Sequence, residues 1–319
     1  MTVTTDRQIS NPDAAPFRIT PRVVAMLAVL DRHHILTSDQ IARLDGGSHQ
    51  KVLRILKRGC DLGLWDHVGA CNDALTPFFD ARPRAYALSR KGARVLAAAG
   101  VPVNVNIDRT TRNKRAVLLQ HTVDVAELML FGFHAACAAH GSLRVIDQQD
   151  LPLPAATRAL RKPFYLRTHV RPTDLPQLAK IIKQPTDIGA EADRWFQIAQ
   201  PDNTAWAYAL ELDRATMDVS ARSLKKATYF RKLLAYYAAF AASVHVDHFG
   251  LAFKVFRVLT VTTGDARIAN MIEAQVSITQ GACSGLFLYS TPAKIAASGA
   301  FGPVWTSSKG DGISLLDRN

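Results

Sequence analysis

The stretch from Thr37 to Leu96 most constrains the fold of this chain, because its helix, turn and strand signals follow one another in a fixed order. Thr37, Ser38 and Asp39 supply side-chain oxygens that can cap a short helix, which Gly46-Gly47 then ends. The helix that follows ends at Gly63 and has two faces at helical spacing. Its predicted inward residues are Val52, Leu53, Ile55 and Leu56, and its predicted outward residues are Lys51, Arg54, Lys57 and Arg58.

Extended segments at Leu64-Trp65 and Ala85–Leu88 predict a β-hairpin, after which Ser89 can cap a last helix. This order resembles the winged helix-turn-helix family over residues 20–98, above all at Leu62-Gly63-Leu64-Trp65 and Tyr86-Ala87-Leu88-Ser89-Arg90-Lys91-Gly92. The resemblance implies a recognition helix in the major groove of DNA and a wing on phosphate or minor groove. The matching residues are Ser48, His49, Gln50, Lys51, Arg54 and Lys57 on the helix, and Arg82 and Arg84 on the wing. The alternative is that these charges only form a solvated helix face.

Composition agrees with a nucleic-acid partner. The chain has 319 residues, enough for two domains, and a formal net charge of +12, which favours a polyanion. Its four cysteines show no C-x-x-C spacing, and the N-terminus lacks an apolar leader, so we expect a cytoplasmic protein. We find no uncharged apolar run of about 18 residues and expect no membrane partner.

The patterning predicts a mixed α/β (α+β) chain with five parts. These are a flexible tail over 1–16, a winged helix domain over 17–98, a basic linker over 99–115, an α/β domain over 116–290 and a C-terminal tail over 291–319. Long helices are expected at about 116–139 and 220–242. Residues 151–187 are expected to form a long basic loop or a partly ordered insertion, in which Phe164 and Tyr165 either pack on the surface or contact nucleic acid.

Three carboxylates are expected to meet in the second domain. Asp193 stands before one predicted strand, whereas Glu211 and Asp213 lie near the end of the next and share a face because they are two apart. Three oxygen ligands could hold Mg²⁺ and activate water against a phosphodiester. The alternative is that Glu211 and Asp213 are strand-end charges paired with Arg214 or with helix lysines.

The predicted mixed sheet flanked by helices resembles the restriction-endonuclease-like, PD-(D/E)xK nuclease fold over residues 116–290. The resemblance implies Asp193, Glu211 and Asp213 as metal ligands and, with Lys232, as catalytic residues of an Mg-dependent endonuclease or nickase. The sequence departs from the family pattern, because Ala192 replaces the proline and Asp213 stands where the lysine belongs. Lys232, with Tyr236 four residues later, is the best replacement for that lysine.

Three segments together resemble the replication-relaxation family of plasmid and mobile-element proteins. They are Tyr86–Gly92, Leu210-Glu211-Leu212-Asp213-Arg214-Ala215-Thr216 and Lys232-Leu233-Leu234-Ala235-Tyr236. The resemblance implies a DNA-binding protein of plasmid replication or mobilisation that uses a degenerate nuclease-like domain as scaffold, without a required cofactor. Its implied partners are duplex DNA at a replication or transfer origin, relaxase or replication proteins, and a second copy of the chain. An Mg-dependent endonuclease and a transcriptional repressor with a C-terminal dimerisation or sensing domain remain the alternatives.

Overall fold

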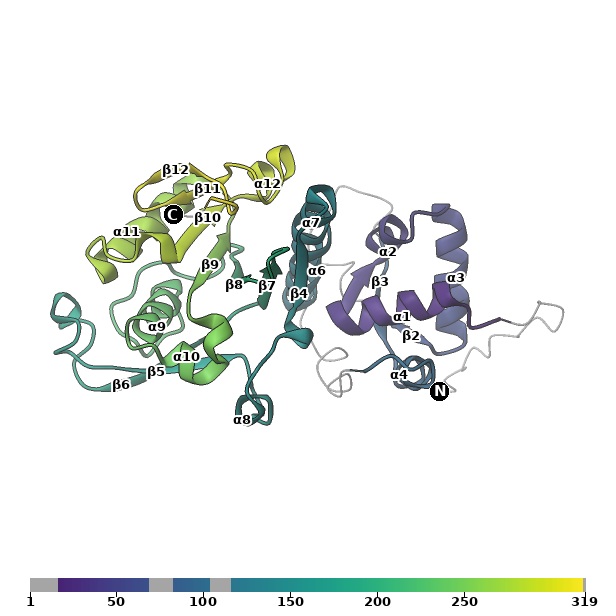
Figure 1. Ribbon diagram of the computed structural model, residues 1–319, viewed down its shortest axis with the longest axis horizontal. Helices are drawn as coiled ribbons and strands as arrows, with labels where there is room; N and C mark the ends of the chain where they lie inside the picture. Colours follow the sequence, from purple (N-terminus) through teal and green to yellow (C-terminus); the bar gives the residue numbers. More distant parts are fainter. Residues whose placement is uncertain (1–16, 69–82, 104–115, 318–319) are drawn as a thin grey trace, which may run out of the picture. The chain divides into compact units, whose positions relative to one another are not determined.

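The computed structural model describes residues 17–68, 83–103 and 116–317, and it divides into two compact units, Met1–Val123 and Asp124–Asn319. Figure 1 labels helices and strands of both units. The predicted tail over 1–16, most of the linker and the middle of the hairpin, including Arg82, lie outside the described residues. The chain is mixed α/β, as the sequence predicts.

The first unit follows the order of elements expected from the sequence, with one short strand in addition. Its elements are α1 (Pro21–His33), β1 (Ile35–Thr37), α2 (Ser38–Asp45), α3 (His49–Asp61), β2 (Trp65–His67), β3 (Ala85–Leu88), α4 (Arg90–Ala98) and the first part of α6 (Ala116–Glu127). The strands form an antiparallel sheet in the order β1-β3-β2. The division between the units falls inside α6, whose Leu119 and Val123 pack against Ile35, Ala85 and Ala87 of this sheet.

Local signals set the helix ends of the first unit. Thr37 and Gln40 form a reciprocal capping box at the start of α2, and Gly46 ends that helix at φ 68°. Ser89 caps α4 by accepting a hydrogen bond of 2.9 Å from the backbone N–H of Gly92. These caps satisfy backbone groups that a helix end would otherwise leave unpaired.

Helix α3 is fixed to the hairpin through Trp65. The indole N–H of this buried side chain donates to the backbone oxygen of Leu56 at 2.7 Å. Gly59 lets the ring lie directly on the helix, because a Cβ at this position would stand 2.0 Å from the ring. Leu53, predicted to face inward, is instead 37% exposed, since the buried side of α3 is made by Val52, Leu56 and Gly59.

The second unit is built on a seven-stranded mixed sheet in the order β12-β11-β10-β9-β8-β7-β4. Its strands are β4 (Arg144–Asp147), β7 (Arg194–Ala199), β8 (Ala205–Leu212), β9 (Phe256–Val261), β10 (Phe287–Ser290), β11 (Trp305–Ser307) and β12 (Gly310–Ile313). Strands β8, β9 and β10 run parallel, and the other neighbouring pairs run antiparallel.

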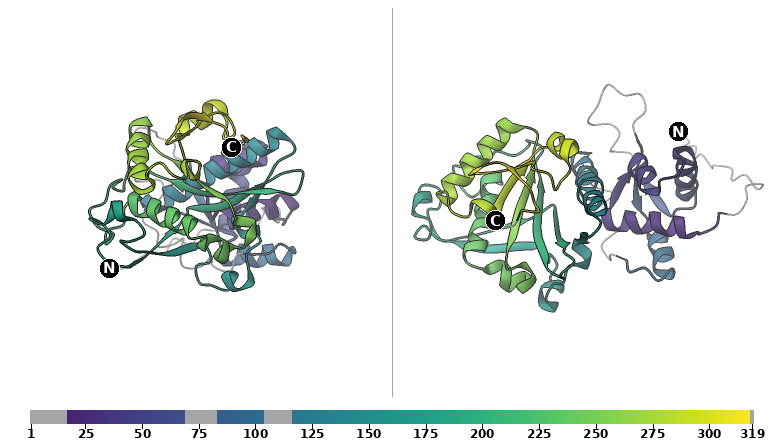
Figure 2. Two further views of the ribbon diagram at one scale, coloured as in Figure 1. Left: turned by 60° about the vertical axis from the view of Figure 1, so that its left-hand side comes forward. Right: turned by 45° about the horizontal axis from the view of Figure 1, so that its top comes forward.

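Helices cover both faces of this sheet (Figures 1 and 2). One face carries α9 (Tyr229–Ala241), α10 (Val244–Phe249), α11 (Asp265–Thr279) and a two-stranded hairpin of β5 (Tyr165–Val170) and β6 (Thr186–Glu191). The other carries the end of α6, the π-helical turn η2 (Leu128–His134), α7 (Ala135–His140) and α12 (Pro292–Ser298). Short segments are α8 (Ala155–Arg158) and the 3₁₀ turns η3 (Gln148–Asp150), η4 (Pro176–Leu178), η5 (Leu251–Phe253) and η6 (Ser284–Leu286).

In the described part of the chain, one helical stretch, Leu118–His140, is long and apolar enough to cross a membrane by length and composition only. Its Met129 and Phe133 are fully buried in the core on the α7 side of the sheet.

Three expectations for the second unit are wrong. The long loop expected over 151–187 is wrong, whereas its alternative, a partly ordered insertion, agrees with the presence of α8 and of strand β5, which pairs with β6 along six residue pairs. Helix α9 begins at Tyr229 instead of about 220, because Thr228 is its cap and accepts from the backbone N–H of Arg231. The segment after Ser290 forms α12, β11 and β12, and its Trp305 is fully buried.

Candidate nucleic-acid interface and carboxylate site

Three of the four residues predicted to face outward on α3 are exposed, and the fourth, Arg58, is half-buried. Lys51, Arg54 and Lys57 are three residues apart and all exposed, whereas Val52 and Leu56 are fully buried on the opposite side. This spacing places the three cations on one side of the helix. The first turn of α3 contains no acidic residue, so the charge of Lys51 in that turn is not offset there.

The other predicted contact residues of this unit are exposed where the structure describes them. Ser48, His49 and Gln50 stand at the start of α3, and Arg84 precedes β3. The imidazole Nε2 of His49 lies 3.1 Å from a carboxylate oxygen of Asp39, and both side chains are exposed. The first turn of α3 and the first turn of α2 are therefore joined at the surface.

Glu211 faces α9 because of its place in β8. Alternate residues of this strand, Ala207 and Ala209, belong to the core on the α9 side, and Glu211 continues that series. Its carboxylate accepts hydrogen bonds from Lys232 Nζ at 2.6 Å and from Tyr236 Oη at 2.7 Å. Lys232 and Tyr236 are one helical turn apart, so the K-x-x-x-Y spacing brings both donors to the same carboxylate.

Burial dominates the electrostatics of this pair. Loss of hydration raises the pKa of Glu211 from 4.5 to about 7, and Asp193 adds to the rise, while Lys232 opposes it. For Lys232, burial works against the charged form, but Glu211, Asp193 and Asp213 together outweigh it and raise the pKa. Lys232 thus feels the negative charge of all three predicted carboxylates, and it contacts Glu211.

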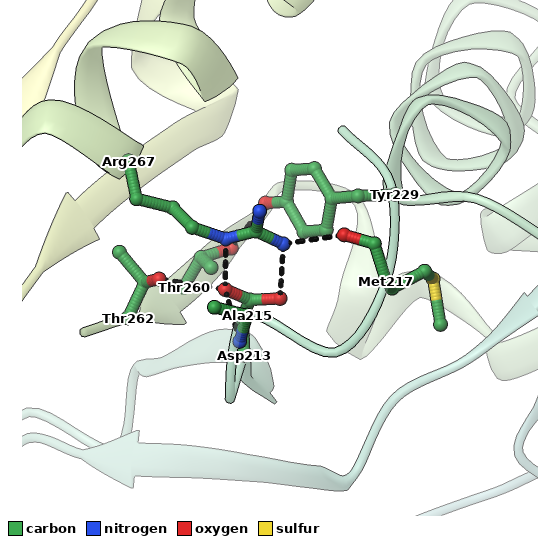
Figure 3. A network of polar contacts seen from close by, with 7 residues as sticks. All are labelled: Asp213, Ala215, Met217, Tyr229, Thr260, Thr262 and Arg267. Carbon is green, nitrogen blue, oxygen red and sulfur yellow. Dashed lines mark hydrogen bonds and ion pairs between the residues drawn. The ribbon is translucent and has the colours of Figure 1, made fainter. Parts of the chain in front are cut away.

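Asp213 is held by a different partner, Arg267 of α11 (Figure 3). Two guanidinium nitrogens of Arg267 donate to the carboxylate, at 2.6 Å and 2.9 Å, and Thr262 Oγ1 donates at 2.7 Å. Although burial pushes the pKa of Asp213 up, the hydrogen bonds from Arg267 and Thr262 hold it below its ordinary value. Arg214, offered by the sequence as a partner of these carboxylates, instead lies 3.7 Å from Asp124.

The same arginine fixes the loop that follows β8. Arg267 also donates to the backbone oxygen of Met217 at 2.6 Å, and the backbone N–H of Ala215 donates to Asp213. Ala215 has a φ of 57°, a left-handed conformation that a residue with a Cβ adopts at a cost. The Asp213–Arg267 pair therefore holds the backbone between β8 and α9 in a strained course.

Asp193 joins the neighbouring strands. One of its carboxylate oxygens accepts from the backbone N–H of Leu212 at 2.8 Å, which ties the start of β7 to the end of β8. All three predicted carboxylates are therefore engaged by protein donors, and the described residues hold no group of three or more His, Cys, Asp or Glu side chains suited to a metal. The predicted metal ligands therefore stay a prediction.

Sequence reasoning missed Arg267. It lies 54 residues after Asp213, in a helix beyond the next strand, and no spacing in the sequence links the two. Lys232 and Tyr236 were named through the resemblance to the nuclease fold, and their spacing of four residues places both on one side of a helix.

Fold and site together define an α/β protein with a basic exposed helix in its first unit and a buried carboxylate–lysine pair on the sheet of its second. The chain belongs to the replication-relaxation family, whose profile matches residues 27–251. The match includes α3, Glu211 and Lys232, whereas Arg267 lies beyond it. Comparisons with curated proteins and with solved structures found no match. Membership of this family indicates a role in replication or mobilisation.

Proposed function

We propose that this protein acts in plasmid replication or mobilisation by binding duplex DNA through a winged helix-turn-helix formed by its first unit. The observation that carries the proposal is the exposed row of Lys51, Arg54 and Lys57 on a helix whose opposite side is buried. A helix presented in this way can enter the major groove and neutralise phosphates. The order of helices, the three-stranded sheet and the exposed Arg84 support the same interpretation.

The second unit is proposed to act as a nuclease-like scaffold. The mixed sheet flanked by helices suits the resemblance to the PD-(D/E)xK fold. The contacts of Glu211 and Asp213 support a structural use of these carboxylates, because each is paired with a cation from a helix on the α9 side. Such pairs join strand ends to helices without a metal ion.

Salt-dependent binding to origin DNA tests the proposal. Fluorescence anisotropy with a labelled duplex from the origin of the host replicon gives the dissociation constant at several salt concentrations. The variant Arg54→Ala/Lys57→Ala is expected to bind more weakly and to lower the slope of log K against log salt by about 1.8, since each phosphate contact contributes roughly 0.9.

The matched control is Lys91→Ala/Arg94→Ala, which removes two exposed cations from α4 of the same unit. This control is expected to change affinity and slope much less than the α3 variant. Equal effects would show that net charge, and not the position of α3, governs binding. An unchanged slope in the α3 variant would show that Arg54 and Lys57 do not contact the DNA backbone.

One observation favours an endonuclease as the second candidate function. Lys232 and Glu211 form a carboxylate–lysine pair at 2.6 Å, which are the residue types that the nuclease resemblance requires. Incubation of the protein with supercoiled plasmid and Mg²⁺ tests this function. Nicking that disappears in Asp193→Ala and Glu211→Ala would support the enzyme, whereas protection of one origin without nicking would support the scaffold.

A further inference from the structure

The hairpin of β5 and β6 has one buried face and one exposed face. Leu166 and Val170 of β5 and Ile188 of β6 point into the core shared with α9. The alternate residues of β5 point outward, and Arg167 and His169 are exposed. Figure 1 shows both strands running past α9 and α10, so the outer face belongs to the surface of the second unit.

This outer face and the turns next to it carry a surplus of positive charge. The exposed cations are Arg161, Lys162, Arg167, Arg171, Lys180 and Lys183. The two acidic side chains of β6 are already occupied, because Asp187 accepts from Arg167 and His169, and Glu191 accepts from Lys162. Within the described residues, Arg161, Arg171, Lys180 and Lys183 form no ion pair, so their charge is open to an anionic partner.

An aromatic ring lies among these cations. The ring of Tyr165 lies directly against Gly189 of the opposite strand. A Cβ at position 189 would stand 2.5 Å from the ring carbon Cζ. Lys162 Nζ lies 5.8 Å from the centre of the Tyr165 ring. Phe164, the neighbouring aromatic residue, instead packs inward, with its ring centre 6.4 Å from that of Phe249. Tyr165 is therefore the aromatic residue that the hairpin presents on its basic face.

We propose that the outer face of the β5–β6 hairpin binds single-stranded DNA. The cations at its edges attract the phosphate backbone, and the half-exposed Tyr165 ring offers a stacking surface to an unpaired base. A duplex makes little use of such a ring, because its bases already stack on one another. This site is separate from α3 and does not depend on duplex binding by the first unit.

Full-length protein and a labelled dT20 oligonucleotide test the site by fluorescence anisotropy over a series of salt concentrations. Arg161→Gln/Arg171→Gln is expected to weaken binding and to lower the salt slope by about 1.4, since each phosphate of a single strand contributes roughly 0.7. Tyr165→Leu is expected to weaken binding about tenfold without changing the slope, because stacking releases no counterions.

The matched control is Lys254→Gln/Lys309→Gln, which removes two exposed cations elsewhere in the same unit and is expected to leave dT20 binding nearly unchanged. Binding to origin duplex is expected to be unaffected in all three variants, whereas Arg54→Ala/Lys57→Ala lowers duplex binding alone. Unchanged dT20 binding in the hairpin variants, or an equal loss in the control, would overturn the site. Failure of duplex binding with intact dT20 binding would count against the function of α3 only.

Discussion

Lys232 of α9 donates to Glu211 of β8 at 2.6 Å, and 29% of the lysine side chain and 4% of the glutamate side chain are exposed. The second donor, Tyr236, is fully buried and occupies the other carboxylate oxygen. Three side chains from two elements thus satisfy one another where water is largely excluded. This network fixes the rotation of α9 about its own axis, because both donors must face the end of β8.

Removal of the lysine charge is expected to destabilise the second unit. In Lys232→Met, the Glu211 carboxylate stays buried without its cation, and the free energy of unfolding should fall by about 3 kcal/mol. Urea unfolding followed by circular dichroism measures this change. Lys226→Met is the matched control, because Lys226 pairs with Asp218 at the same distance of 2.6 Å in solvent, and it should cost less than about 0.5 kcal/mol.

The double variant Lys232→Met/Glu211→Gln separates loss of charge from loss of packing. Glutamine removes the unpaired charge and still accepts a hydrogen bond from Tyr236. We expect the double variant to be more stable than Lys232→Met alone. If it is less stable than Lys232→Met, the cost arises from lost contacts of the lysine stem and not from a buried carboxylate.

Glu211 is expected to make the stability of the second unit depend on pH. Its pKa is about 7 in the folded state and 4.5 in the unfolded state, so between these values only the folded state binds the proton. The stabilisation by this group is therefore complete below pH 4.5 and is lost as pH rises through 7. Between pH 4 and 8 the free energy of unfolding of the wild type should fall by about 3 kcal/mol relative to that of Glu211→Gln. Urea unfolding at each pH measures this difference. Parallel pH profiles would contradict this assignment.

Local signals predicted much of this structure. The cap of α4 at Ser89 and the strand Ala85–Leu88 depend on residues next to each other in sequence, and both match the structure. The K-x-x-x-Y spacing of Lys232 and Tyr236 likewise belongs to one helix, and it explains why both residues reach one carboxylate. Each of these features depends only on residues within or next to a single helix or strand.

Features that depend on distant packing were missed. Strand β6 contains Asp187, Gly189 and Glu191, which are poor strand formers, and it is a strand because it pairs with β5 and its inner face packs on α9. Strands β11 and β12 lie in a segment rich in glycine and serine, whose one strong signal is the buried Trp305. Contacts with residues far away in the sequence determine that these segments form strands, and local sequence patterns do not reveal such contacts.

The geometry of the Asp213–Arg267 pair predicts that arginine cannot be replaced by lysine. A lysine has one ammonium group and cannot donate to both carboxylate oxygens and to the Met217 carbonyl in the geometry of the guanidinium. Arg267→Lys should therefore lower the free energy of unfolding by about 2 kcal/mol. Arg167→Lys, at an exposed pair with Asp187, is the control and should be nearly neutral. A neutral Arg267→Lys would show that the loop does not depend on this pair.

Combining Arg267→Lys with Ala215→Gly tests the strain in this loop. Glycine adopts the φ of 57° found at position 215 without the penalty of a Cβ. The glycine should therefore be tolerated in the wild type and should offset part of the loss in Arg267→Lys. Hydrogen exchange of the Met217 and Asp218 amides gives a local measure of the same effect, with faster exchange expected in Arg267→Lys.

Substitution of Gly59 by alanine tests the attachment of α3 to the hairpin. A Cβ at this position would stand 2.0 Å from the Trp65 ring, so Gly59→Ala must displace the ring or the helix and should cost about 2 kcal/mol. Gly132→Ala is the matched control, because its Cβ would meet Ile295 at 4.0 Å and alanine favours a helix. We expect thermal unfolding to shift down for Gly59→Ala and not for Gly132→Ala. If the helix is the part that moves, duplex binding should also weaken with Gly59→Ala; full affinity with lowered stability would show that the Trp65 ring moves instead.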